Sequence, residues 1–497
     1  MNSAYSSIPK RSYLELQSHN GSENLRSPPI THVNLVPFDD EEGVGNGYLH
    51  SSNGVHNDDG FDEDLGPEFD NHPLIDTGSK TGSGISGAVF NLTTTIIGAG
   101  IMALPAAMKV LGLVLGIFVI ILMGLLSEYS VELLVKFSVL VKASSYGEVV
   151  QHALGRPAKV ISEIFIIVNN AGVLIVYLII MGDVMSGSLN HIGVFDQWLG
   201  HGVWDHRKLL ILVIVVLLLA PLCALERIES LSLTSAASVA LAVLFVVVAC
   251  VIAFIKLVEG KIESPRIGPD FGSKKAILDL LVVVPIMTNA YVCHFNVQPI
   301  YNELEGRTPQ KMNRVGRITT VICIVVYAFT SVSGYLLFGQ GTESDVLTNF
   351  DKNLGIRFSS ELNYIVRVGY IFHLVLVFPV VHFSLRQTVD ALLFEGSAPL
   401  LESRKRSLGL TAVLLVLIYF GSTMIPNIWT AFKVTGATTA VSLGFIFPSL
   451  IALRLGQQRG CLSFGEKFLS RLMLVFAILV GVFGMIGNIY SIESQSE

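Results

Sequence analysis

The chain has 497 residues, of which 51% are hydrophobic and only 14% are charged, and its mean hydropathy is +0.61. Apolar residues gather in continuous runs. Crossing a hydrocarbon core about 30 Å thick takes roughly 20 helical residues, and the runs are long enough for that. Continuous runs exclude a membrane β-barrel, because barrel strands alternate apolar and polar residues. The composition therefore predicts an all-α membrane protein.

Residues 1–82 differ from the rest of the chain. They hold fourteen acidic residues against four basic ones, are rich in Gly, Ser, Asn and Pro, and show no apolar period. Such a segment cannot bury enough apolar surface to offset its chain entropy. It also lacks the apolar core of a cleaved signal peptide. We expect a disordered, acidic, cytosolic tail.

Eleven candidate transmembrane helices follow the tail. They cover approximately residues 85–108, 113–135, 160–189, 209–225, 235–257, 277–297, 318–338, 364–385, 408–424, 428–453 and 468–489. If the N-terminus is cytosolic, the cytosolic connections hold roughly seventeen basic residues and the opposite ones roughly ten. The positive-inside rule therefore favours a multi-pass protein with a cytosolic N-terminus.

The first and sixth spans contain residues that weaken a helix. The first has Gly98 and Gly100, followed by Pro105, and the sixth lies between Pro285 and Pro299. Glycine and proline both disfavour continuous helical hydrogen bonding. A structural alternative is that the glycines only permit close helix packing and the prolines only kink the spans.

The two interrupted spans occupy matching places in two sets of five. We assign residues 83–258 to a first five-helix repeat, 259–455 to a second, and 456–497 to an eleventh helix with a short C-terminal tail. Inverted-repeat transporters place their substrate between two discontinuous helices near the bilayer midplane. The exposed N–H groups and positive dipole of a half-helix suit a carboxylate there.

Three segments carry a family resemblance: residues 90–105 (FNLTTTIIGAGIMALP), 177–183 (YLIIMGD) and 293–304 (CHFNVQPIYNEL). They resemble the amino acid/auxin permease family. Within it, the chain is similar to plant and fungal vacuolar amino acid transporters and, more distantly, to sodium-coupled neutral amino acid transporters. The likeness covers about residues 84–490. It implies a LeuT-like fold of five plus five helices with one helix added.

The resemblance also implies a substrate site at the two interrupted spans. Main-chain groups around the glycines would meet the carboxylate and amine of an amino acid, with polar side chains beside them. The candidate substrate-binding residues are Thr94, Gly98, Ala99, Gly100, Ile101, Asn289 and His294.

The sequence departs from the sodium-coupled relatives at two positions. Those proteins carry an asparagine where Thr94 stands here, and a threonine in the eighth span where this chain reads Val375-Leu-Val377-Phe-Pro379. A sodium ion needs several oxygen ligands, and two are lost. We therefore favour proton coupling, or facilitated movement, over sodium coupling.

Three ionisable residues inside spans are candidates for coupling, because a charge in the bilayer is costly and calls for a function. They are Asp183 in the third span, His294 in the sixth and His373 in the eighth. Histidine is suited to proton linkage since it titrates near neutral pH. The alternatives are that Asp183 only caps the end of its span and that His294 is a neutral, hydrogen-bonded side chain.

Short segments of the tail resemble sorting signals: residues 5–8 (YSSI), 13–16 (YLEL) and 70–75 (DNHPLI). They predict contact with sorting adaptors and a vacuolar or endolysosomal membrane, with the plasma membrane second. The leading function is a proton-linked carrier of amino acids. The alternatives are a sodium-coupled symporter of neutral amino acids at the plasma membrane and an amino-acid sensor with little flux. We predict no enzyme activity, cofactor, metal site or nucleic-acid partner.

Overall fold

The computed structural model describes residues 83–188, 191–200, 202–225, 229–425 and 428–496. The predicted tail and its three sorting-like segments lie outside these residues. The helices and strands are α1 (Ile85–Ile96), α2 (Gly100–Leu111), α3 (Leu113–Val141), α4 (Tyr146–Leu154), α5 (Arg156–Ser186), β1 (Gly187–Ser188), β2 (His191–Ile192), α6 (Val194–Leu199), α7 (Arg207–Ile214), α8 (Ala220–Cys223), α9 (Ser232–Val258), α10 (Lys274–Tyr291), α11 (His294–Glu303), α12 (Pro309–Phe338), α13 (Ser359–Leu393), α14 (Arg404–Met424), α15 (Ile428–Thr435), α16 (Phe447–Arg459) and α17 (Phe464–Ser496).

Most of these helices belong to spans of transmembrane length and composition. Nine helical spans in the described part of the chain could cross a membrane, and the bent pair α1–α2 makes a tenth. They match ten of the eleven expected spans. The fourth expected span is helical over residues 207–223, but the π-helical segment η2 (Val215–Leu219) divides it into short pieces. The helical membrane fold is thus confirmed, whereas the count of eleven stays a prediction.

Both expected helix breaks are present. α1 ends at Ile96 and α2 begins at Gly100, and the two helices are bent by 54°. α10 ends at Tyr291 and α11 begins at His294, with a smaller bend, so that they count together as one span. Ile97 in the first break and Val292 in the second have extended backbone, and Cys293 is irregular, which interrupts the helical hydrogen bonds.

The prolines named in the sequence lie beside the breaks rather than within them. Pro105 lies inside α2, Pro285 inside α10 and Pro299 inside α11. Gly98, in contrast, falls within the first break. The prolines thus lie within the half-helices, and the second break falls between Pro285 and Pro299, as the sequence indicated.

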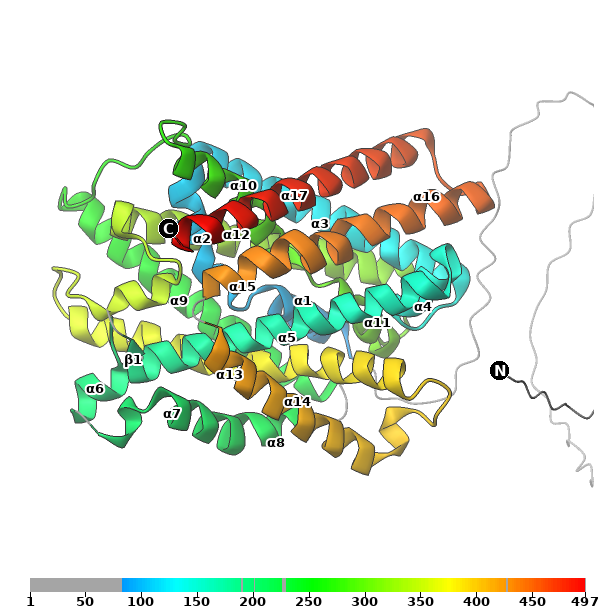
Figure 1. The fold of residues 1–497 in the computed structure, drawn as a ribbon, viewed down its shortest axis with the longest axis horizontal. Coiled ribbons are helices and arrows are strands. Elements are labelled where there is room, and N and C mark those ends of the chain that lie inside the picture. Colours follow the sequence, from blue (N-terminus) through cyan, green and yellow to red (C-terminus); the bar gives the residue numbers. More distant parts are fainter. Residues whose placement is uncertain (1–82, 189–190, 201, 226–228, 426–427, 497) are drawn as a thin grey trace, which may run out of the picture. The chain divides into compact units, whose positions relative to one another are not determined.

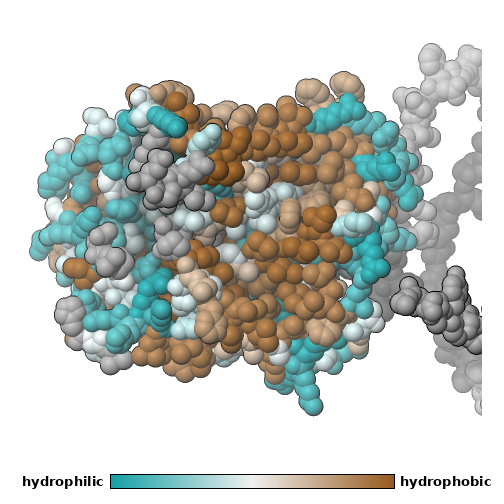
Figure 2. Space-filling model, viewed as in Figure 1, coloured by the Kyte–Doolittle hydropathy of each residue, from teal (hydrophilic) through white to brown (hydrophobic). Residues whose placement is uncertain are grey.

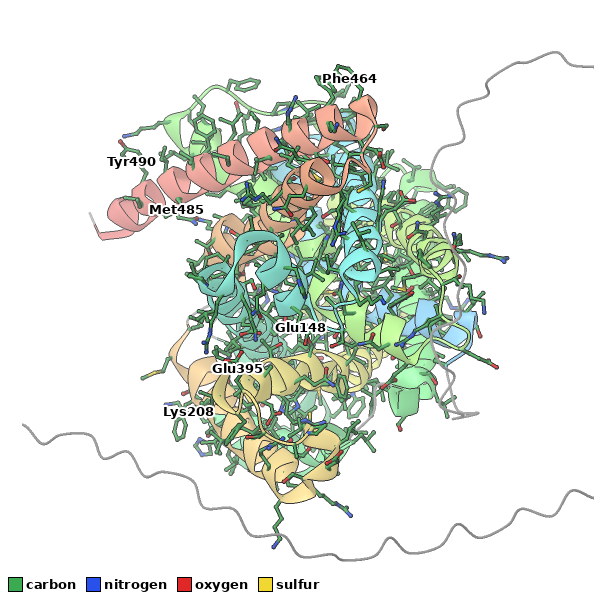
Figure 3. The ribbon with its side chains drawn as sticks, turned by 90° about the vertical axis from the view of Figure 1, so that its right-hand side faces the viewer. Glu148, Lys208, Glu395, Phe464, Met485 and Tyr490 are labelled. Carbon is green, nitrogen blue, oxygen red and sulfur yellow. The ribbon has the colours of Figure 1, made fainter. Side chains whose placement is uncertain are left out.

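Hydrophobic and hydrophilic residues are separated on the surface of the helical body, as in a membrane protein. Figure 2 shows hydrophobic residues over the middle of one face and hydrophilic residues at its two ends. α17 runs along the edge of the body, and its labelled residues Phe464, Met485 and Tyr490 are 84%, 49% and 46% exposed (Figure 3). Large exposed apolar side chains on a helix of this length fit contact with lipid rather than water.

α1 and α2 lie inside the body, where other helices surround them (Figure 1). α1 packs against α9, α12 and α13, and α2 packs against α10 and α12. The tenth span is one helical run over Ile428–Arg459 that contains two π-helical segments, η7 (Gly436–Ala440) and η8 (Ser442–Ile446). A Cβ at Gly436 would overlap the carbonyl group of Pro285, so glycine lets this span approach α10 closely.

One end of the body is covered by short elements. β1 and β2 form a small antiparallel hairpin after α5, and the 3₁₀ helix η5 (Val346–Asp351) follows α12. η5 packs against α2, α5, β2 and α13, and its residues 346–350 are buried. We call residues 345–351 the plug, and the end of the body where they lie, at which α2 ends, the plug side.

The match of the two broken spans to the first helix of each half agrees with an inverted repeat. The boundaries proposed for the repeats, 83–258 and 259–455, stay predictions, as does the assignment of 456–497.

Candidate functional site

A narrow cavity lies between the two helix breaks. It is bounded by both interrupted spans together with α5, α13 and α15. The lining residues are Thr95, Ile96, Gly98, Ala99, Gly100, Asn169, Val173, Tyr177, Asn289, Ala290, Val292, Phe295, Val381 and Phe432. None of these described lining residues carries a charge. The site therefore combines main-chain groups, two asparagines and a tyrosine with an apolar wall.

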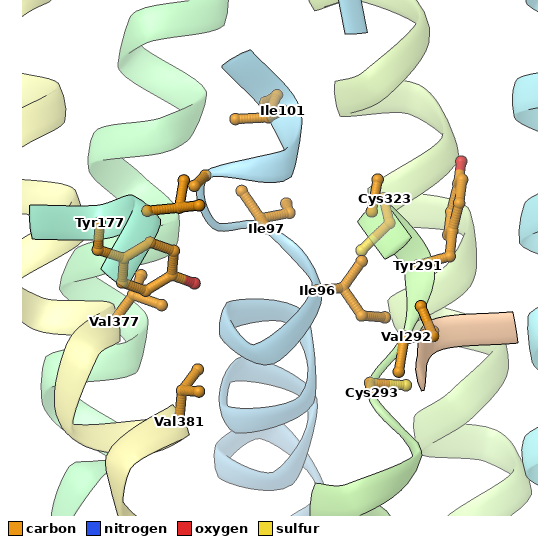
Figure 4. Packing of buried hydrophobic residues seen from close by; sticks show 14 of the residues in the cluster. Ile96, Ile97, Ile101, Tyr177, Tyr291, Val292, Cys293, Cys323, Val377 and Val381 are labelled. Atoms are coloured by element: carbon orange, nitrogen blue, oxygen red, sulfur yellow. The ribbon is translucent and has the colours of Figure 1, made fainter. Parts of the chain in front are cut away.

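Small residues at the first break allow close contacts. A Cβ at Gly98 would overlap the hydroxyl group of Tyr177, which points toward the extended loop beside Ile97 in Figure 4. A Cβ at Gly100 would lie 3.0 Å from the Cα of Ala290 on α10. Glycine at both positions thus brings the first break against Tyr177 on one side and against the second broken span on the other.

Tyrosine hydroxyls satisfy the carbonyl groups that the breaks expose. The Tyr327 hydroxyl on α12 lies 2.6 Å from the carbonyl oxygen of Ile96 and 2.7 Å from that of Ala290. The Tyr370 hydroxyl on α13 donates to the carbonyl oxygen of Gly98 at 2.7 Å. A hydroxyl has one hydrogen, so Tyr327 serves two acceptors, one at each break, with a single donor.

Two asparagines link the cavity to the tenth span. Asn289 Nδ2 donates to Thr435 Oγ1 at 3.1 Å, and Thr439 Oγ1 lies 3.1 Å from Asn169 Oδ1. The Asn289 Oδ1 atom is buried and accepts no hydrogen bond from the described residues. Such an orphaned acceptor is uncommon in folded proteins, and an ammonium group would satisfy it.

The structure brings together four of the seven predicted substrate-binding residues. The four that line the cavity are Gly98, Ala99, Gly100 and Asn289. Thr94 faces away, because its hydroxyl donates to the carbonyl oxygen of Ser235 on α9 at 3.1 Å. Ile101 is fully buried in the hydrophobic core beyond the cavity. A role for any of them in binding stays a prediction.

His294 begins α11 and is fully buried, but it does not line the cavity. Its Nε2 lies 3.0 Å from Ser130 Oγ on α3. The Ser130 hydroxyl donates its hydrogen to the carbonyl oxygen of Gly444, so Nε2 must carry the proton and donate to Ser130. This geometry agrees with the alternative of a neutral, hydrogen-bonded histidine, and a coupling role stays a prediction.

The two other coupling candidates have different surroundings. Asp183 Oδ1 lies 2.6 Å from Arg207 Nε, an ion pair that joins α5 to α7 at the plug side. His373 is fully buried beside the first break, with Nδ1 2.8 Å from the Ser238 carbonyl oxygen on α9. Its ring centroid is 4.7 Å from that of Tyr370. His373 therefore lies beside the first break, whereas the Asp183 ion pair lies near the end of α5, and a coupling role for either stays a prediction.

The sequence did not single out the tyrosines, Asn169 or Thr435. A buried tyrosine in the middle of an apolar span offers a weak signal, because its hydroxyl needs a partner. Nothing in the sequence indicates which partner it finds. The hydrogen bonds run between spans far apart in the chain, so only the folded arrangement reveals them.

Comparison with known proteins decides the family. The family model described as "Transmembrane amino acid transporter protein" matches residues 81–493. The chain belongs to this family. Over its full length it is 70% identical to amino acid transporter AVT6E of Arabidopsis thaliana, all of which is covered. It is 45% identical to amino acid transporter AVT6A of the same plant, over 84% of this chain and 90% of that protein.

Solved structures confirm the fold. A mutant of the manganese transporter of Eremococcus coleocola aligns with a TM-score of 0.54 over 83% of this chain and 86% of its own, at 13% identity. A Na⁺-coupled sialic acid symporter aligns with a TM-score of 0.50 over 81% of this chain and 89% of its own, at 12% identity. Family and fold together make this chain a multi-pass amino acid transporter with a LeuT-like fold, and not an enzyme.

Gly98→Ala tests the contact between the first break and Tyr177. The added methyl group must displace the tyrosine or the loop, and overpacking of this kind costs about 1–3 kcal/mol, so we expect transport to fall about tenfold or more. Uptake of labelled amino acids into vesicles, at matched amounts of folded protein, measures the effect. Gly369→Ala on α13 is the control, because a Cβ there meets nothing within 4 Å. Equal rates in the two variants would contradict the assigned contact.

Tyr327→Phe tests the donor shared by the breaks. It removes the hydrogen that serves Ile96 and Ala290, and a buried unsatisfied carbonyl costs about 1–3 kcal/mol. We expect a lower unfolding temperature in detergent and reduced transport. The control is Tyr419→Phe, whose hydroxyl makes an exposed 3.3 Å hydrogen bond to the Lys208 carbonyl oxygen. An unchanged unfolding temperature for Tyr327→Phe would show that the breaks do not depend on this hydroxyl.

Proposed function

We propose that this protein is a proton-linked secondary transporter that moves amino acids with uncharged side chains across a vacuolar or endolysosomal membrane. The observation that carries the proposal is the cavity between two broken helices. Its described lining is uncharged, yet it presents helix ends of opposite polarity.

The polarity of the helix ends fits a zwitterion. α2 begins at the cavity with Gly100, and a helix N-terminus carries a partial positive charge suited to a carboxylate. α10 ends there at Tyr291, and a helix C-terminus is partially negative. The orphaned Oδ1 of Asn289 adds an acceptor on the α10 side. The carboxylate and ammonium groups of an amino acid can thus both be bound without a charged side chain.

The apolar part of the cavity wall indicates which substrate side chains the cavity would accept. Val173, Phe295, Val381 and Phe432 are apolar, and burial of an unpaired charge against such residues is costly. This favours amino acids whose side chains are neutral. The names of the Arabidopsis relatives, amino acid transporters, support the general class of substrate.

The first break favours a proton over sodium. Hard cations bind through several oxygen ligands. Here the carbonyl oxygens of Ile96 and Gly98 already accept tyrosine hydroxyls, and the Thr94 hydroxyl donates to Ser235. The eighth span offers the buried side chain of Val377 rather than a hydroxyl. Few oxygens therefore remain to surround a sodium ion.

The proposed location in an intracellular membrane is based on the sequence of the tail. Residues 5–8, 13–16 and 70–75 resemble signals that sorting adaptors bind, and the distribution of basic residues favours a cytosolic tail. The signal-like segments support an intracellular membrane, and a cytosolic tail is where sorting adaptors could bind them. Imaging a tagged chain with Leu74 and Ile75 changed to alanine would test the address.

Transport in reconstituted vesicles tests the proposed function. We expect labelled alanine and glutamine to accumulate when a pH gradient is imposed, and aspartate and lysine to accumulate far less. Replacing sodium with choline should leave the uptake unchanged, because the structure offers a poor sodium site. Strong sodium dependence would support the sodium-coupled alternative. Binding without accumulation would support the sensor.

His373→Gln tests whether His373 or His294 is the residue that couples transport to protons. We expect it to lose most of the accumulation driven by a pH gradient while it keeps exchange of labelled for unlabelled substrate at equal pH, because only the titrating ring is removed. His294→Gln is the matched control, since its side-chain amide can still donate to Ser130. If His294→Gln flattens the pH profile and His373→Gln does not, coupling lies at the second break.

A further inference from the structure

A group of charged side chains lies around the plug, away from the cavity. The plug packs against α2, α5, β2 and α13. Near the plug, the titratable or charged side chains on these elements, within the plug and just before it include Lys109, Asp183, His191, Glu343, Asp345, Asp351, Glu361, Tyr364, Arg367 and Tyr370.

Asp345 stands out within this group. It is 6% exposed, and its Oδ1 accepts the backbone N–H of Leu347 at 2.9 Å, which caps the first turn of η5. The carboxyl group is thus fixed in place by the plug itself. If the plug moves away from α2, α5 and α13, this carboxyl group leaves its buried position.

The nearby charges are engaged with other partners. Arg207 pairs with Asp183, and His191 Nδ1 lies 3.0 Å from Asp351 Oδ2. Arg367 donates to the carbonyl oxygens of Val184 at 2.9 Å and Ile192 at 2.6 Å, and to Gln197 Oε1 at 3.2 Å. Lys109 donates to the carbonyl oxygens of Gln340 and Thr342. Glu343 is exposed.

This environment disfavours an ionised Asp345. Burial raises the pKa of its carboxyl group to about 7, the Leu347 N–H and Arg367 oppose the increase, and the like charge of Asp183 adds to it. An exposed aspartate has a pKa of about 3.9. The buried and exposed positions of this one group therefore differ in their affinity for a proton.

We propose that Asp345 is a proton-binding site that fills when the plug closes and empties when the plug opens. The closed plug buries the carboxyl group, and closure over a neutral acid avoids burying a charge.

The direction of the linkage follows from the two pKa values. Because the pKa is raised in the closed form, the stabilisation of that form by the proton is complete below about pH 4 and is lost as the pH rises to about 7. Within this window the closed-to-open ratio falls by up to about tenfold per pH unit. An acidic solution on the plug side therefore favours closure.

The site is also connected to the cavity. Arg367, Tyr370 and His373 follow one another at intervals of three residues along α13, so they lie on one side of the helix. Asp345 interacts electrostatically with Arg367 and with Tyr370, whose hydroxyl reaches the first break at Gly98. Use of this proton in coupling rests on the proposed proton-linked function, whereas the proton site itself does not.

Closure can be measured without transport. Val346→Cys places a thiol on the plug at a position that is 1% exposed, in a protein whose partly exposed Cys250 and Cys461 are changed to alanine. The rate of labelling by a membrane-impermeant maleimide applied to the plug side reports opening. The same measurement on the Asp345→Asn variant corrects for the pH dependence of the thiol itself. We expect the labelling rate of the protein that retains Asp345, divided by the rate of the Asp345→Asn variant, to rise by up to about tenfold per pH unit between pH 5 and 7 and then to level off.

Asn at this position is chosen because it keeps the helix cap while removing the titration. The matched control is Glu343→Gln, an exposed carboxyl group two residues earlier, which should leave the pH dependence as in the unmodified chain. His191→Gln removes the titratable ring on β2 that lies 3.0 Å from Asp351 of the plug. Retention of the pH dependence in Asp345→Asn, or its loss only in His191→Gln, would overturn the proposal.

Transport then separates this inference from the proposed function. If pH-driven accumulation occurs and Asp345→Asn lowers its pH dependence between pH 5 and 7, Asp345 takes part in coupling. If accumulation occurs and Asp345→Asn leaves the pH profile unchanged, the part of the proposal that links Asp345 to coupling fails alone. Absence of pH-driven accumulation in the unmodified chain, with the labelling result intact, would refute the proposed function and leave the proton site.

Discussion

A broken helix inside a bilayer exposes backbone groups where no water is available, and each of them needs a partner in the protein. The structure meets this need with side chains from neighbouring spans. Tyr327 reaches a carbonyl oxygen at each break, Tyr370 reaches Gly98, and Asn296 Nδ2 on α11 donates to Thr95 Oγ1 on α1 at 2.9 Å. These hydrogen bonds join the two broken spans to each other and to α12 and α13, and the cavity lies between the spans that they hold together.

The sequence predicts the features that local residues determine, and it does not predict those that contacts with neighbouring spans determine. Apolar runs identify the spans because lipid selects for length and hydrophobicity, and Gly98 marks the first break because it lies within a short irregular segment. Pro105, Pro285 and Pro299 identify the interrupted spans but not the break positions, since helices tolerate proline in a membrane when neighbours satisfy the freed groups. The second break falls at Val292 and Cys293, two residues with no local tendency to end a helix.

The candidate site divides in a similar way. The contribution of Gly98 and its neighbours to the cavity could be predicted, because the helix break that places their main-chain groups there is a local feature of the sequence. Thr94 could not be placed, because a shift of one residue along a helix changes the face: Thr95 lines the cavity, whereas Thr94 donates to Ser235 on α9. Asn169 and Thr435 come from spans far away in sequence, and the π-helical segment that follows Thr435 alters the helical register that a regular pattern would assume.

The shared hydroxyl of Tyr327 has one more consequence. Its single hydrogen lies between two oxygens, and both of these belong to residues of the cavity wall, Ile96 and Ala290. At any moment one acceptor lacks this donor. One shared hydrogen holds the two broken spans less firmly than two separate hydrogen bonds would, so the junction at Tyr327 can shift toward either break without the loss of a full hydrogen bond.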